Sequence, residues 1–213
     1  MEKLTVNFND DLAISGELIE KINQVCRQVE NDSSIKQLTL AFETASVNEQ
    51  TSQVADPDLL HKWEKALRRV ENLDALIVAR AETACGLVAL SMIAIADLRV
   101  GTPGSTFSLR GKDLTLPGML IHRLTRQLSD QWVRSLLILG NTLSADEAVT
   151  CGLLDRVSTQ PAALAEDMVM SMNSFVFNDI RVRRKLILEA SHTSYDDTIG
   201  LSLSASDRAI RKG

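Results

Sequence analysis

Residues 82–118 constrain the fold of this chain more than any other stretch of its sequence. An apolar run at 76–79 leads into a turn of mostly small residues, Glu82-Thr83-Ala84-Cys85-Gly86. Every residue from 87 to 96 is apolar except Ser91, and a helix that is apolar on all sides has to be buried. The first N–H groups of such a helix lack acceptors within it and favour negative charge. The sequence therefore predicts a buried central helix whose N-terminus can bind a polarised oxygen.

Hydrophobic periodicity and capping residues place the other elements around this helix. Strands are expected at about 3–8, 36–42, 75–81, 97–100 and 106–109. Residues 12–15 are a candidate hairpin partner for the first strand. Helices are expected at 17–30, from Pro57 with Asp56 as its cap, at 119–128, at 130–139, after the capping box Ser144-Ala145-Asp146-Glu147, and through most of the chain beyond Pro161.

The composition is that of a globular protein, with 45% hydrophobic and 24% charged residues. The length of 213 residues predicts a single domain. A net charge of −5 argues against a nucleic-acid partner, because phosphates repel an acidic surface. No run reaches transmembrane length and no leader segment is recognisable, so no membrane partner is expected. Three cysteines, Cys26, Cys85 and Cys151, have neither an even count nor metal-ligand spacing, which predicts a reducing cytoplasm and no metal site.

Several short blocks between about residues 63 and 157 share one order. They are Ala96-Asp97-Leu98-Arg99-Val100, Thr106-Phe107-Ser108, Leu114-Thr115-Leu116-Pro117-Gly118, residues 139–148 and Cys151-Gly152-Leu153-Leu154-Asp155-Arg156-Val157. In this order they resemble the signature of the crotonase (enoyl-CoA hydratase/isomerase) superfamily. The resemblance implies an α/β fold with a crotonase-like ββα spiral core at 1–160 and a helical C-terminal trimerisation region at 161–213, within one domain overall.

The same resemblance implies a ligand and an assembly. The ligand is an acyl-CoA thioester, with coenzyme A as part of the substrate and no separate cofactor. The assembly is a homotrimer or a dimer of trimers. The substrate-binding residues are Cys85, Gly86, Leu87, Val88, Pro117 and Gly118, with the N–H groups of Gly86 and Val88, or of Leu87, facing the thioester oxygen. A loop at 43–53 should supply the other half of this oxyanion hole, but its donor residue is not identifiable from the sequence.

The chain departs from the family at its two catalytic carboxylates. Counting from Asp97, the first glutamate of the hydratases falls on Ser91, and counting from Phe107, the second falls on Gly111. Neither Ser nor Gly can exchange a proton near neutral pH, whereas hydration of an enoyl thioester needs an acid and a base. Glu82, Asp113 and His122 are the candidate substitutes. We expect Ser91 to bond back to a helix carbonyl, and Cys85 to be a small packing residue rather than a thiolate.

One branch of the superfamily resembles this chain in further short sequence motifs. They are Trp63-Glu64, Leu67-Arg68-Arg69, Cys85-Gly86 and Pro117-Gly118-Met119. It is the short auxiliary crotonase of the 3,5-dihydroxyphenylacetyl-CoA pathway, which works beside a type III polyketide synthase. Three functions follow as hypotheses. The chain binds an acyl- or polyketide-CoA and assists such a synthase; it is an active hydratase, dehydratase or isomerase with displaced acid and base; or it is a structural trimer without a ligand. Loss of both carboxylates favours the first over the second, and retention of the Cys85-Gly86 turn and of Pro117-Gly118 favours the first over the third.

Overall fold

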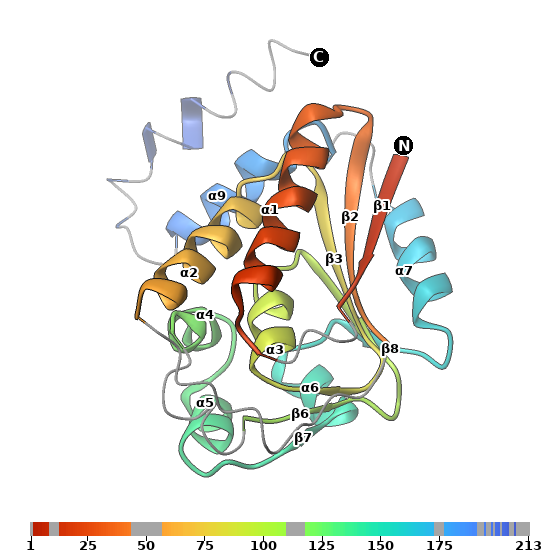
Figure 1. Cartoon of the computed structure of the whole chain (residues 1–213), viewed down its shortest axis with the longest axis vertical. Coiled ribbons are helices and arrows are strands. Elements are labelled where there is room, and N and C mark those ends of the chain that lie inside the picture. Colours follow the sequence, from red (N-terminus) through yellow and green to blue (C-terminus); the bar gives the residue numbers. More distant parts are fainter. Residues whose placement is uncertain are drawn as a thin grey trace.

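The computed structural model of the chain describes residues 2–8, 13–43, 57–109, 118–172 and 177–190, together with residues 194, 197, 199–200, 202–204 and 207. These residues form two sheets and the helices that cover them (Figure 1). The predicted α/β class is confirmed.

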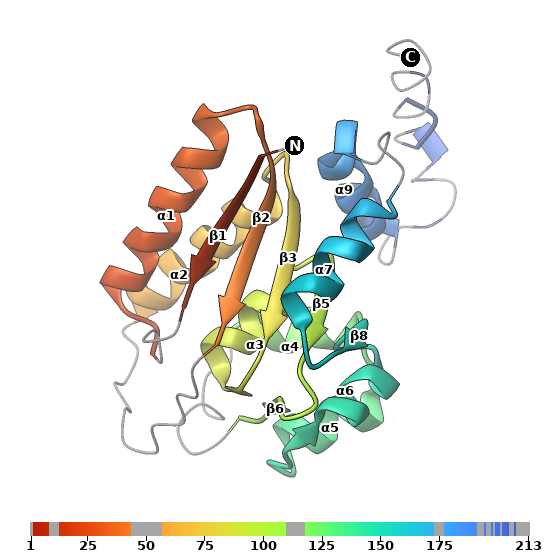
Figure 2. The ribbon, with the colours of Figure 1, turned by 90° about the vertical axis from the view of Figure 1, so that its right-hand side faces the viewer.

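The larger sheet is parallel throughout and has the strand order β1-β2-β3-β5-β8. Its strands are β1 (Glu2–Asn7), β2 (Ile35–Phe42), β3 (Leu76–Ala81), β5 (Leu98–Gly101) and β8 (Arg156–Val157), and Figure 2 shows the first four in this order. The predicted positions of β1, β2, β3 and β5 are confirmed, but β8 was not predicted and the hairpin at 12–15 is wrong. β1 pairs in parallel with β2, and residues 13–15 lead directly into a helix that Ser15 caps.

The smaller sheet has the order β4-β6-β7 and consists of β4 (Ala84–Cys85), β6 (Thr106–Phe107) and β7 (Leu143–Ser144). β4 pairs in parallel with β6, and β6 pairs antiparallel with β7. This sheet therefore fixes the turn before the central helix to the segment that follows β5.

The helices match the sequence pattern except at their ends. They are α1 (Gly16–Asn31), α2 (Pro57–Glu71), α3 (Leu87–Ile93), α4 (Leu120–Thr125), α5 (Asp130–Leu137), α6 (Ala145–Cys151), α7 (Pro161–Met170) and α9 (Ile180–Ala190). The capping box of α6 forms as predicted, and Gly152 ends this helix in the left-handed conformation. α3 ends three residues earlier than the apolar run predicts, since residues 94 and 95 form a turn.

The parallel sheet is buried on both faces, as parallel sheets generally are. Figure 1 shows α1 and α2 on one side of the sheet and α7 on the other. Ile77 and Ala79 of β3 join the larger apolar cluster, whereas Leu76 and Val78 pack with Ala165 of α7. Alternate residues of β3 therefore face opposite sides.

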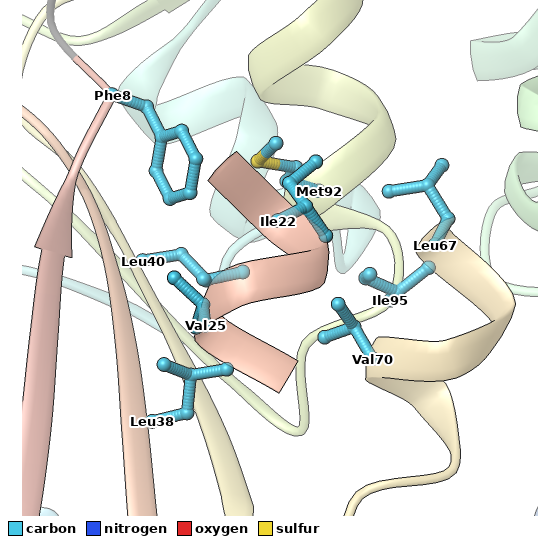
Figure 3. A pocket seen from close by; sticks show the side chains of 9 residues that line it. All are labelled: Phe8, Ile22, Val25, Leu38, Leu40, Leu67, Val70, Met92 and Ile95. Atoms are coloured by element: carbon cyan, nitrogen blue, oxygen red, sulfur yellow. The ribbon is translucent and has the colours of Figure 1, made fainter. Parts of the chain in front are cut away.

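The larger cluster surrounds α3, which confirms the prediction of a buried central helix. Figure 3 shows where α1, α2 and β2 meet the C-terminal end of α3, around a void of about 10 Å³. Apolar side chains line the void, among them Leu38, Leu67 and Met92. A space this small without polar partners stays dry.

A buried arginine, not anticipated from the sequence, attaches α9 to the core. The guanidinium of Arg184 donates to both carboxylate oxygens of Asp97 at 2.7 and 2.6 Å, and to the carbonyls of Glu71, Leu73 and Ala75 at 2.7–3.0 Å. Asp97 also accepts the N–H of Ile77 at 2.8 Å. Every polar group of this arginine is therefore satisfied, which is the condition for burying a charge without a large penalty.

Candidate functional site

The turn before α3 is held in place by the smaller sheet. The N–H of Thr106 donates to the carbonyl of Thr83 at 3.3 Å, and the N–H of Ser108 donates to the carbonyl of Cys85 at 3.1 Å. Gly86 is the N-cap of α3 in an extended conformation, and no side chain caps this helix end. The N–H groups of the first helical turn have no acceptors inside a helix. The turn thus presents backbone donors from a fixed position.

Cys85 lies at the end of β4 and is 2% exposed. Burial raises the pKa of its thiol to about 12, and the thiol donates weakly to the carbonyl of Thr83 at 3.5 Å. The side chain is therefore a neutral thiol at physiological pH, which supports its interpretation as a small packing residue rather than a nucleophile.

Ser91, which the sequence comparison predicts at the position of the first family carboxylate, lies in the middle of α3. Its hydroxyl donates to the carbonyl of Leu87 at 2.8 Å, as the sequence predicts. The side chain is buried among apolar neighbours of the helix. Gly111, predicted at the position of the second carboxylate, lies outside the described residues, as does the candidate substitute Asp113.

Glu82, another candidate acid or base, forms an ion pair with Arg80. The Nε of Arg80 lies 3.0 Å from a carboxylate oxygen of Glu82, and the same guanidinium donates to Glu43. The Arg80–Glu82 contact is an ion pair without a hydrogen bond, because neither Nε of Arg80 nor this oxygen of Glu82 has a hydrogen-bond partner. Arg80 follows Val78 by two positions in β3, so its side chain points to the α7 face of the sheet. Glu82 therefore pairs away from α3.

Gly118 begins the approach to α4 and packs against α2. Its φ of +53° lies in the left-handed region, and a Cβ atom there would come within 2.9 Å of an oxygen of Glu64. That same carboxylate accepts the N–H of Met119 at 3.0 Å and a hydrogen bond from Arg123 at 2.9 Å. Glycine is required here both by the backbone conformation and by the close approach of Glu64.

A groove of about 1170 Å³ opens between α2, α4 and α9. Gly118 and the exposed His122 of α4 both line this groove, and so do residues 94–97 after the end of α3. Residues 85–88 lie at the start of α3, about 10 Å away along a helix of seven residues. The structure therefore places Gly118 and His122 together at the groove, and Cys85, Gly86, Leu87 and Val88 at the opposite end of α3.

Other predicted site residues fall outside the described chain. They are Pro117 and all of the loop 43–53 except Glu43, so the second oxyanion donor is not located. Within the described ranges, no three His, Cys, Asp or Glu side chains converge as metal ligands would. In the same part of the chain, no helix is both long and apolar enough to cross a membrane.

Comparison with known proteins gives one clear relative. No family model matches the chain. A protein named enoyl-CoA hydratase from Amycolatopsis orientalis is 30% identical over 211 residues, which make up 99% of this chain and 97% of that protein.

Solved structures agree with the architecture. An enoyl-CoA hydratase from Mycobacterium smegmatis superposes with a TM-score of 0.84 at 18% identity, covering 96% of this chain and 86% of that one. The human enoyl coenzyme A hydratase domain-containing protein 3 superposes with a TM-score of 0.80 at 13% identity. The superposition covers 97% of this chain and 87% of the human one. Identities this low show the fold alone, and they confirm the fold predicted from the sequence.

Proposed function

The chain belongs to the crotonase (enoyl-CoA hydratase) superfamily, and on this premise we propose that it binds an acyl- or polyketide-CoA thioester at residues 85–88. The observation that carries the proposal is the turn at Gly86. It opens a buried helix without a side-chain cap and is fixed to β6 by backbone hydrogen bonds. A backbone held in this way loses little freedom when it binds a carbonyl oxygen.

In this proposal the N–H groups of Gly86 and Val88, or of Leu87, donate to the thioester oxygen. Fixed donors at a helix N-terminus polarise a carbonyl and stabilise the negative charge of an enolate. This role needs no ionisable side chain, which agrees with the neutral thiol of Cys85 and the bonded hydroxyl of Ser91. The coenzyme A moiety enters as part of the substrate.

The biological role that fits these donors is assistance to a type III polyketide synthase that makes 3,5-dihydroxyphenylacetyl-CoA. The short sequence motifs that this chain shares with the auxiliary branch of the superfamily support this role. So does the bonded serine at the first carboxylate position, because a protein that only holds a thioester has no need of an acid and a base there.

An active hydratase, dehydratase or isomerase is the alternative function. It is favoured by the name of the 30% identical relative, enoyl-CoA hydratase. It would require Glu82, Asp113 or His122 as the proton carrier, and the Glu82 carboxylate is already paired with Arg80. A steady-state assay with crotonyl-CoA separates the two. A rate typical of enzymes, about 1–1000 per second, would favour the alternative, and turnover near zero supports thioester binding.

The replacement Gly86→Val tests the proposed site. A branched side chain at the N-cap should crowd the donors and weaken the binding of acetyl-CoA, measured by isothermal titration calorimetry. Loss of one such donor costs on the order of 3 kcal/mol of transition-state stabilisation in acyl-transfer enzymes. We take the corresponding factor of about a hundred as the upper bound for the weakening of acetyl-CoA binding. Stimulation of a type III polyketide synthase should fall in parallel.

Gly104→Val is the matched control, because nothing lies within 4 Å of a Cβ atom at this exposed turn. It should bind acetyl-CoA like the wild type. If Gly86→Val folds and keeps the wild-type affinity, the donors at residues 86–88 do not hold the thioester. If the wild-type protein binds neither CoA nor acetyl-CoA, the third hypothesis, a structural trimer without a ligand, takes its place.

A further inference from the structure

The outer edge of β1 has no partner strand among the described residues. β1 comes first in the strand order β1-β2-β3-β5-β8, and in the described part of the chain it pairs with β2 alone (Figure 2). A strand at the edge of a sheet presents a row of N–H and C=O groups that can pair with another strand. The edge of β1 is therefore a template for one further strand.

The hydrogen bonds between β1 and β2 identify the residues whose backbone faces this edge. The N–H of Phe8 donates to the carbonyl of Ala41 at 2.8 Å, so the backbone of Phe8 faces β2. Successive residues of a strand turn their N–H and C=O groups to opposite sides. The even-numbered residues of β1 therefore bond to β2, and Lys3, Thr5 and Asn7 direct their backbone groups outward.

β1 lacks the features that commonly protect a sheet edge from pairing. Its register with β2 runs without a bulge from Lys3 to Asn7, and the strand contains no proline. A basic side chain on an edge strand can repel an approaching strand. In β1 the only such side chain is Lys3, and its charge is paired with Glu166 of α7. The edge is therefore suited to accept a strand.

The side chains of β1 are complementary to those of a second β1. Leu4 and Val6 are half-buried against the larger core cluster, whereas Thr5 is exposed on the opposite face. In an antiparallel pair with a two-fold axis at Thr5, this threonine lies opposite its own copy, and Leu4 lies opposite Val6. Apolar pairs and Thr–Thr pairs across strands stabilise a sheet. A two-fold contact requires a strand that is complementary to itself, and β1 meets this requirement.

We propose that the edge of β1 pairs antiparallel with β1 of a second copy of this chain, which joins the two five-stranded sheets. Thr5 exchanges both backbone hydrogen bonds with Thr5 of the second copy, and Lys3 does so with Asn7. The carbonyl of Asn7 also accepts from Lys21 at 2.8 Å and keeps a second lone pair for this bond. The contact doubles whatever assembly the C-terminal region makes, so it depends neither on that region nor on the thioester site.

Cysteine cross-linking tests the pairing and its register. Opposite residues that exchange hydrogen bonds in antiparallel strands have Cα atoms about 5.5 Å apart, which a disulfide can bridge. Thr5→Cys should therefore form a covalent dimer under mild oxidation, seen by non-reducing gel electrophoresis. In Lys3→Cys, the matched control on the same face, the two cysteines lie about 14 Å apart along the strands, so the yield should be at least about fivefold lower. The wild type, with Cys26 and Cys85 buried, gives the background.

A proline at position 5 tests the hydrogen bonds at the edge. Proline lacks an N–H group and is tolerated on an edge strand where that group points away from the sheet. Thr5→Pro should therefore keep the pairing of β1 with β2 and abolish the pairing with the second copy. Thr5→Val keeps the N–H and the strand preference and is the matched control. Sedimentation velocity should give about half the wild-type mass for Thr5→Pro and the wild-type mass for Thr5→Val, at equal protein concentration.

Three results would overturn the proposal. Absence of a covalent dimer in Thr5→Cys would show that the two strands do not meet. An equal yield of dimer in Lys3→Cys would show that cross-linking follows exposure of the cysteine and not a fixed register. Equal sedimenting masses of Thr5→Pro and Thr5→Val, both folded by circular dichroism, would show that the N–H of residue 5 makes no contact between copies. If Thr5→Pro does not fold, the two cysteine variants decide.

Discussion

The side chains of Cys85 and Ser91 flank the first turn of α3, and each is 2% exposed. Burial alone sets the ionisation of the thiol, because its raised pKa has no cause other than desolvation. The hydroxyl avoids the same penalty by donating to the carbonyl one turn earlier. Both residues are therefore polar groups made inert by their surroundings, and any chemistry at this turn falls to the backbone.

The two buried cysteines, Cys26 and Cys85, should make the free energy of unfolding depend on pH. Burial raises the pKa of Cys85 to about 12 and that of Cys26 to about 11, from an ordinary value of 9.0. Above pH 9 the unfolded chain loses these protons while the folded chain keeps them. The free energy of unfolding should therefore fall as the pH rises from 9 towards 11.

Urea denaturation of the wild type and of the Cys26→Ala, Cys85→Ala double variant at several pH values measures this effect. The variant will be less stable throughout, because the replacement leaves cavities, so the comparison is between slopes. Its decline above pH 9 should be shallower than that of the wild type. Parallel declines would mean that neither thiol stays protonated in the folded chain.

At the scale of elements, each helix is held by a different kind of contact. α1 and α2 pack their apolar stripes into the larger core cluster. α6 is stabilised locally, by the capping box of Ser144 and Glu147 and by the left-handed Gly152. α9 depends on Arg184, whose five hydrogen bonds reach back to Asp97 and to the segment between α2 and β3.

The substitution Arg184→Met should release α9 from the core. It leaves Asp97 without its cation, and the three backbone carbonyls that accept hydrogen bonds from Arg184 lose their donor. Removing one partner of a buried ion pair typically lowers the free energy of unfolding by about 3–5 kcal/mol. Urea denaturation should show a loss of this order, and hydrogen exchange should show faster exchange of the amides in α9.

Arg183→Met provides the comparison, because Arg183 is the neighbouring residue and its side chain is exposed. It should change the stability by less than about 0.5 kcal/mol. Equal protection of α9 in the two variants would contradict the anchoring role of Arg184.

For the whole molecule, the family resemblance predicts a trimer or a dimer of trimers, and the C-terminal region that should make the contact exposes apolar side chains. Met170 at the end of α7 is 80% exposed, and Leu203 is 62% exposed. Exposed apolar side chains of this size are common where chains associate. The exposed Met170 and Leu203 agree with the prediction that residues beyond 160 make the contact between subunits. Sedimentation tests this prediction.

Sedimentation velocity at micromolar concentration should show a trimer or hexamer for the wild type. Met170→Glu should shift the distribution towards smaller species, because it places a charge in an apolar interface. Ile138→Glu introduces the same charge at a residue that is 71% exposed but precedes the C-terminal region, and it should leave the assembly unchanged. A stable wild-type monomer, or equal effects of both variants, would argue against assembly through the C-terminal region.

The sequence by itself determined the local elements of this protein. The alternation in β1, the apolar run of α3, Pro57 at the start of α2 and the capping box of α6 each lie within a few residues, and each appears where predicted. The hydrogen bond from the Ser91 hydroxyl to the carbonyl of Leu87 was likewise predicted from the sequence, since its acceptor lies one helical turn earlier.

Tertiary structure alone decided which distant groups meet. Arg184 bonds to Asp97 across 87 positions, and Arg123 bonds to Glu64 across 59. In the sequence, Glu82 is a free carboxylate near the turn, and only the fold pairs it with Arg80 on the far face of β3. The groove also exists only because α2, α4 and α9 converge. Backbone hydrogen bonding and side-chain periodicity are set by near neighbours, whereas the partner of a buried charge depends on how the whole chain packs.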